Sequence, residues 1–105
     1  MLDFDVTEIL QIENRITIFT GKIVGGEVHI GDNVALVSGS GKISFTVKRL
    51  EPNGFRHSGA KAGCNVAIVT EYLELSPFAG SMRWTGGHYE SQSLKILSDK
   101  IDGAA

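Results

Sequence analysis

The sequence has almost no cysteine and no long apolar run. Its single cysteine, Cys64, cannot form a disulfide within the chain and lacks the nearby second ligand of a zinc finger. No stretch approaches the roughly 20 apolar residues of a membrane-spanning helix. The first residues are acidic, whereas a secretory signal begins with basic ones. These absences predict a cytoplasmic protein that is not cross-linked and does not associate with a membrane.

The chain also lacks a large excess of charge of either sign, because it has 10 Lys and Arg residues and 12 Asp and Glu residues. The formal net charge of -2 argues against a protein that binds nucleic acid through an overall positive charge. The distribution is uneven, since residues 1–41 are mainly acidic and residues 42–61 contain a single acid, Glu51. This pattern is compatible with either a basic patch or an ordinary solvated face. The basic residues of the second stretch are Lys42, Lys48, Arg49, Arg56 and Lys61.

What the chain does contain is a dense alternation of apolar and polar residues. In residues 17–37, apolar side chains recur at every second position in short runs, which is the period of a strand with one buried face. Gly25–Gly26 and residues 31–33 interrupt the runs with residues that favour turns. Strands this closely spaced predict a meander of the kind found in sandwiches and barrels.

Three further segments extend the predicted sheet. Residues 4–12 alternate and then shift phase by one position, which predicts a β-bulge. Residues 42–50 alternate again, and residues 65–70 form a continuous apolar run, as in a strand covered on both faces. The sequence therefore predicts one all-β domain folded as a small closed β-barrel. Its inner wall is expected to include Ile18, Val28, Ile30 and residues 66–69.

The last part of the chain is expected to extend this barrel within the same domain, so that residues 1–80 form the barrel and residues 81–105 the extension. Gly86–Gly87 lies between short aromatic flanks, which predicts a β-hairpin. From residue 91 onward, large aliphatic residues recur every three or four positions, which predicts a short amphipathic helix. These residues are Leu94, Leu97 and Ile101.

Two motifs carry a resemblance to a known family. They read TG-x-I-x-x-G over residues 20–26 and IGD-x-V over residues 30–34. With the surrounding strands, they make residues 4–80 resemble domain 2 of the translational GTPases, the small β-barrel that follows the nucleotide-binding domain in elongation factor Tu and its relatives. No G-x-x-x-x-G-K-[ST] loop exists in the sequence, so this chain alone is expected to bind neither GTP nor another cofactor.

The resemblance also implies a binding site. In elongation factor Tu, this barrel holds the terminal adenosine of aminoacyl-tRNA in an apolar pocket with glutamates at its rim. Carrying this pocket over position by position places its apolar walls at Ile12, Ile18 and Val69 and one of its carboxylates at Glu51. The position of the other carboxylate is occupied by Thr7. The alternative is that the three apolar residues belong to the ordinary core and that Glu51 caps a turn.

Two other groups of residues are candidates for contact with RNA or a partner protein. One is the basic set Lys48, Arg49, Arg56 and Lys61. The other is Arg83 with Trp84, because an arginine beside aromatic rings at a hairpin can stack and neutralise single-stranded bases. The alternative for Trp84 is that it seals the base of the barrel.

These observations predict a non-enzymatic binding module that contacts RNA, either tRNA or rRNA, or a translation-related protein. The alternative is a structural domain that acts only beside a partner chain. An enzyme is not supported, because no nucleophile motif or acid–base pair is visible. No metal site is expected, because His29, His57 and His88 are far apart in the sequence.

Overall fold

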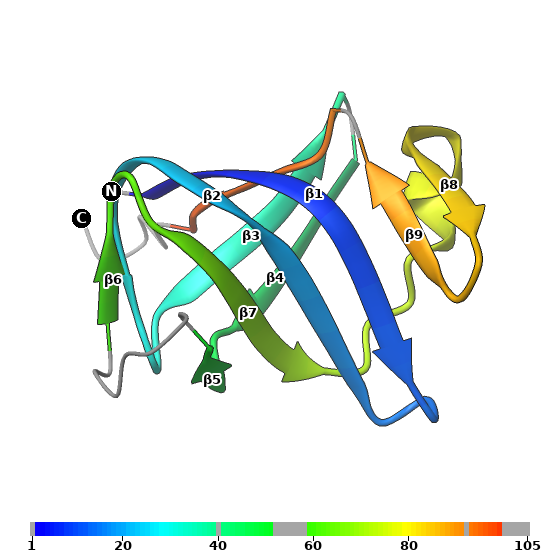
Figure 1. The fold of residues 1–105 in the computed structure, drawn as a ribbon, viewed down its shortest axis with the longest axis horizontal. Coiled ribbons are helices and arrows are strands. Elements are labelled where there is room, and N and C mark those ends of the chain that lie inside the picture. The colour runs from blue at the N-terminus through cyan, green and yellow to red at the C-terminus, as the bar shows by residue number, and fades with distance from the viewer. Residues whose placement is uncertain (1, 40, 52–58, 92, 100–105) are drawn as a thin grey trace.

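The computed structural model describes residues 2–39, 41–51, 59–91 and 93–99. These residues form β-strands and one short 3-10 helix, η1, so the all-β prediction is confirmed (Figure 1). Within the described ranges, no helix is long and apolar enough to span a membrane. The elements are β1 Leu2–Ile12, β2 Ile16–His29, β3 Asn33–Ser38, β4 Gly41–Thr46, β5 Arg49–Leu50, β6 Gly59–Lys61, β7 Asn65–Glu71, η1 Ser76–Ser81, β8 Met82–Thr85, β9 His88–Ser91 and β10 Lys95–Ser98.

The strands form a strongly curled antiparallel sheet in the order β4-β3-β10-β1-β2-β7-β5 (Figure 1). The sheet is open, because no ladder between described residues joins β4 to β5, so the predicted closed barrel is not shown and the described sheet is a curled half-barrel. The two end strands are consecutive in the chain, and Val47 and Lys48 cross the gap between them. There the Gly31 N–H donates to the Val47 carbonyl at 2.8 Å, and the Lys48 N–H donates to the Val69 carbonyl at 2.9 Å.

The long pair β1–β2 bends at two register shifts, one at Asp3/Phe4 and one at Val6/Glu8. The second shift confirms the bulge that the sequence predicts within residues 4–12. Thr7 is the extra residue, and its Oγ1 donates to the Thr20 carbonyl at 3.0 Å. A bulge raises the local twist, so the pair curls around the core instead of lying flat.

The first half of β2 buries the face opposite to the one expected. Thr17 and Phe19 are fully buried, whereas Ile18 lies half-exposed on the outer face. Phe19 lies opposite Ile9 and Ile68, and its ring stacks on Phe45 with centroids 5.3 Å apart. Burial of the larger aromatic surface decides the phase of the strand.

The expected inner wall is therefore correct only in part. Val28 is fully buried, and Val66 and Ile68 are buried in the core. Val69 is buried too, but it lies opposite Ile18 on the outer face, and Ala67 is only partly buried. Ile30 is 46% exposed, because β2 ends at His29 and the turn that follows directs the side chain outward. The buried core is made by Leu2, Phe4, Val6, Ile9, Phe19, Ile23, Val28, Val34, Leu36, Phe45, Val47, Leu50, Val66, Ile68, Leu73, Leu75, Phe78, Leu94 and Ile96.

The hairpin predicted around Gly86–Gly87 is confirmed by the pairing of β8 with β9. The helix predicted after residue 91 is wrong over its described part, because residues 95–98 form β10 between β1 and β3. Leu94 and Ile96 are both buried, which is the two-residue period of a strand. The Ser91 hydroxyl does accept a bond from the Leu94 N–H at 3.1 Å, but no helix follows, since two strands offer hydrogen-bonding partners there.

The opposite faces of β2 can be tested at neighbouring positions. Replacing Phe19 with alanine removes a fully buried ring and should lower the free energy of unfolding by about 3–5 kcal/mol. Replacing Ile18 with alanine should lower it by only about 1 kcal/mol, because that side chain lies half-exposed on the outer face. Urea unfolding measures both values, and equal losses would contradict the assigned faces.

Gly21 permits the close approach of β2 to β1. A Cβ at this position would overlap the Asp5 carbonyl oxygen and lie 2.9 Å from the carbonyl carbon. Gly21→Ala should therefore destabilise the protein by about 3 kcal/mol or more, because backbone has to move. Gly25→Ala, in the same strand, meets only the Asp3 Cβ at 3.8 Å and should change stability by less than about 0.5 kcal/mol. Similar thermal unfolding of the two variants would refute this account.

Candidate functional site

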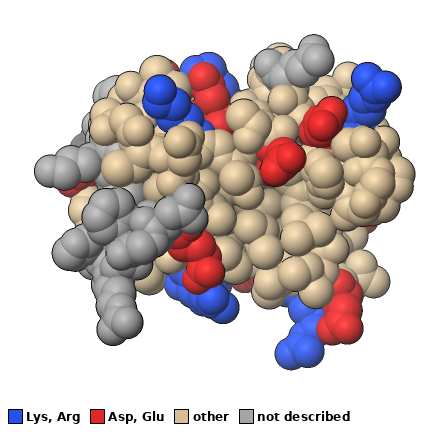
Figure 2. Space-filling view, in the orientation of Figure 1, with Lys and Arg blue, Asp and Glu red and all other residues tan. Residues whose placement is uncertain are grey.

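An apolar surface lies on the outer face of β1, β2 and β7. The register places Leu10 opposite Ile18 and Ile18 opposite Val69, and the next row pairs Ile12 with Ile16. We call these five residues the outer-face patch. Figure 2, in which β1, β2 and β7 are turned toward the viewer, shows a broad uncharged surface with charged side chains at its margins.

The residues of the outer-face patch differ in how far they are exposed to solvent. Leu10 and Ile12 are 37% and 39% exposed, whereas Val69 is only 5% exposed although it points away from the core. Its two neighbours across the strands, Ile18 and Arg49, flank it on either side. Val69 is therefore covered by its neighbours, whereas Leu10 and Ile12 present apolar surface to solvent.

Three of the residues implied by the family resemblance lie together on this face. Ile12, Ile18 and Val69 belong to the outer-face patch, where Ile12 is exposed, Ile18 is half-exposed and Val69 is buried. Glu51 follows β5, and its N–H donates to the Ala67 carbonyl at 2.9 Å. Thr7 lies at the β1 bulge, where it bonds the Thr20 carbonyl.

The rim of the outer-face patch carries a compensated charge pair. Arg49 lies opposite Val69, and its Nη2 donates to Glu51 Oε2 at 2.7 Å. Both side chains are more than half exposed, so their ion pair contributes little to stability, about 0–1 kcal/mol. A ligand can therefore take over either partner without unfolding the site.

Only two side chains of the predicted basic set, those of Lys48 and Arg49, lie in the part of the chain that the structure describes. Lys48 is exposed, and Arg49 is paired with Glu51. Arg56 lies outside the described residues, and Lys61 is placed only as a backbone position in β6.

Arg83 and Trp84 lie on opposite faces of β8, because they are neighbours in a strand. Trp84 is 61% exposed, so it does not seal the barrel, and it packs edge-on against Tyr89 with centroids 4.9 Å apart. Arg83 lies opposite Glu90, which in turn lies opposite Glu8. A base stacked on Trp84 therefore lies on the other side of the hairpin from the Arg83 guanidinium.

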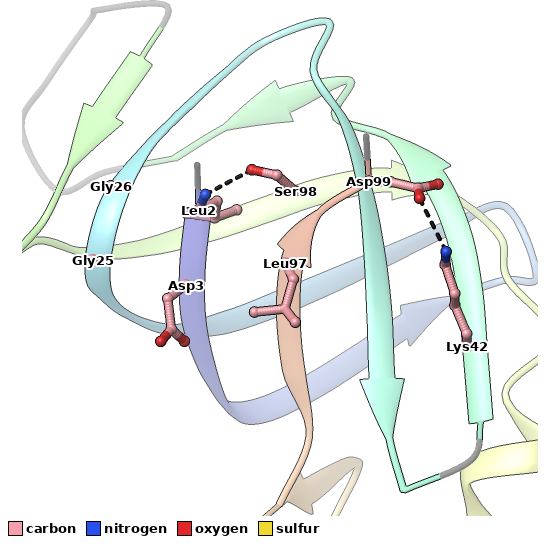
Figure 3. Close-up of a pocket in the computed structure, with 8 residues that line it drawn as sticks. All are labelled: Leu2, Asp3, Gly25, Gly26, Lys42, Leu97, Ser98 and Asp99. Carbon is pink, nitrogen blue, oxygen red and sulfur yellow. Dashed lines mark hydrogen bonds and ion pairs between the residues drawn. The ribbon is translucent and has the colours of Figure 1, made fainter. Parts of the chain in front are cut away.

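A pocket of about 740 Å³ lies where β1, β2, β4 and β10 approach one another (Figure 3). Lys42 Nζ lies 3.1 Å from Asp99 Oδ1, and the Leu2 N–H donates to Ser98 Oγ at 2.6 Å. The sequence analysis missed this pocket, because no local signal connects the two ends of the described chain. The lining residues are Leu2, Asp3, Gly25, Gly26, Lys42, Leu97, Ser98 and Asp99.

The charges around this pocket neutralise one another. A hydrogen bond from Ser44 and the adjacent Lys42 ammonium lower the pKa of Asp99. Lys95, which lies next to the pocket, contacts Asp3 at 2.7 Å and Asp5 at 2.9 Å. An anionic ligand would have to displace these carboxylates. In the described part of the chain, no group of three His, Cys, Asp or Glu side chains is placed to hold a metal ion.

Comparisons with known proteins identify a similar fold. No protein family model matches the chain, and no curated protein matches its sequence. Among solved structures, it is similar to translation elongation factor SelB from Methanococcus maripaludis in its apo form, with a TM-score of 0.64 and 20% identity. The chain has a translation-factor-like β fold. The match covers 87% of this chain and 19% of that protein.

The pairing of Lys95 predicts a pH dependence at the alkaline end. Hydrogen bonds to Asp3 and then Asp5 raise the pKa of Lys95 above its usual 10.5. The stabilisation is therefore complete below the unfolded-state pKa and is lost as the pH rises through the higher folded-state pKa. Urea unfolding should show the advantage of the wild type over Lys95→Met shrinking at strongly alkaline pH. An advantage that does not change with pH would rule out this role.

Proposed function

We propose that the chain is a non-enzymatic domain equivalent to domain 2 of the translational GTPases, and that its outer-face patch holds the terminal adenosine of an aminoacyl-tRNA. The placement of Ile12, Ile18 and Val69 on one outer face, with Glu51 joined to it through Arg49, carries this proposal. The translation-factor-like β fold supports it.

The chemistry of the surface fits a nucleoside. The adenine ring lies over Ile18 and Val69 and removes apolar area from water, at about 25 cal/mol for each Å² buried. Glu51 accepts hydrogen bonds from the ribose hydroxyls, because a carboxylate offers acceptors in several directions. Arg49, released from Glu51, donates to the phosphate that precedes the nucleoside.

A second candidate function is docking of a neighbouring protein domain onto the same patch. The exposed apolar side chains and the compensated charge of Arg49 favour it. The two functions differ in their response to salt. Binding of tRNA should weaken as salt is added, because phosphate contacts release counterions, whereas an apolar protein contact should respond little.

The proposal can be tested by titrating the isotope-labelled chain with an aminoacylated RNA hairpin that ends in the tRNA terminal sequence. Amide shifts should change at the outer-face patch, and Ile18→Asn should weaken binding at least about tenfold, or about 1.4 kcal/mol.

Val24→Asn is the matched control, because Val24 is a 51% exposed apolar residue of β2 outside the patch, and it should leave the affinity unchanged. Loss of affinity in both variants, or shifts confined to another surface, would refute the proposed site. Binding that requires a protein and ignores the RNA would instead establish the docking function.

A further inference from the structure

A groove of about 300 Å³ lies between the segment that follows β7 and the β8–β9 hairpin. Its lining includes Tyr72, Glu74, Met82 and Tyr89, and we call it the aromatic groove. Trp84 extends the same wall, because it lies on the same face of β8 as Met82 and packs against Tyr89. Figure 1 shows the hairpin standing at the side of the sheet. No residue that lines the groove belongs to the outer-face patch.

The wall that carries Tyr72 is held in place before any ligand arrives. Gln11 Nε2 donates to the Leu73 carbonyl at 2.7 Å and to Thr17 Oγ1 at 3.0 Å. Thr17 Oγ1 in turn accepts a bond from the Leu73 N–H at 3.0 Å. Leu73 is also buried in the core. A ligand therefore binds without first ordering this segment, which lowers the entropic cost of association.

The groove is lined by both kinds of side chain, with Tyr72, Tyr89 and Met82 beside the polar Gln11, Glu74 and Ser76. Tyr72 is 37% exposed and Trp84 is 61% exposed, so part of each aromatic side chain is accessible to a ligand. Their hydroxyl and indole N–H groups can donate to carbonyl oxygens. A polyproline II segment suits such a surface, because it combines flat pyrrolidine rings with backbone carbonyls that have no internal partner.

The charge of the groove selects between possible ligands. Glu74 is the charged residue among the described side chains that line it, and Arg83 lies on the opposite face of β8. A carboxylate disfavours nucleic acid phosphates and favours a lysine or arginine. We infer that the aromatic groove binds a proline-containing peptide segment in the polyproline II conformation, with a basic residue that pairs with Glu74.

Trp84 makes this inference directly measurable, because it is the single tryptophan of the chain. The probe is a short synthetic peptide of Ala-Pro-Pro repeats that ends in arginine. Its addition should change the Trp84 emission in a saturable way. Tyr72→Ala should weaken binding at least about tenfold, whereas Ile30→Ala, which truncates an exposed apolar residue elsewhere, should leave it unchanged.

Glu74→Gln provides a second variant that preserves local structure. Glu74 Oε1 accepts bonds from the Ser76 N–H at 3.2 Å and from the Ser76 hydroxyl at 2.9 Å, and a glutamine carbonyl oxygen can accept both. This variant should weaken binding of the arginine peptide several-fold and leave binding of the same peptide ending in alanine unchanged.

Two further ligands complete the test. A peptide with alanine in place of every proline should bind at least about tenfold more weakly, since it lacks the preformed helix. No change in the Trp84 emission, or equal binding of the proline peptide and the peptide without proline, would overturn the inference. Tighter binding of a single-stranded oligouridine would also overturn it and would assign the groove to nucleic acid instead.

Discussion

The antiparallel pairing of β1 with β2 is the constraint on which the rest of the structure depends. It runs from Leu2 opposite Gly26 to Ile12 opposite Ile16, and its bulge at Thr7 bends both strands around the core. The approach is close enough that Gly21 has no room for a side chain beside the Asp5 carbonyl. Every other main strand reaches the sheet through this pair, since β10 adds to β1 and β7 adds to β2.

The same pairing gives the molecule two apolar faces. Inside the curl, Phe19 meets Ile9 and Ile68, and this contact forms the centre of the core. On the outside, the neighbouring row of Leu10, Ile18 and Val69 has no layer over it in the described structure. In this single-layered sheet, one face of β2 is therefore used for folding, and the other leaves apolar side chains uncovered.

Local pattern predicted much of the fold, including the bulge in residues 4–12 and the hairpin at Gly86–Gly87, because each depends on neighbouring residues. The predictions that failed depend on contacts with distant parts of the chain, which local sequence patterns do not contain. Ile18 and Phe19 both suit a buried strand, and only the partners across the sheet decide which one faces inward. Likewise, the spacing of Leu94 and Leu97 fits a helix, but the open edges of β1 and β3 make residues 95–98 a strand. The aromatic groove depends on contacts between distant segments, so no local signal could reveal it.

The pairing of charges explains why recognition by this domain should depend on apolar contacts. Lys42 faces Asp99, Lys95 bridges Asp3 and Asp5, and Arg49 faces Glu51. Each carboxylate compensates the cation beside it, so these three cations generate little net field toward a distant polyanion. In both proposed binding modes, affinity therefore comes mainly from contact with exposed aliphatic or aromatic surface. In the same proposals, Glu51 beside the outer-face patch and Glu74 in the aromatic groove discriminate between ligands by their charge.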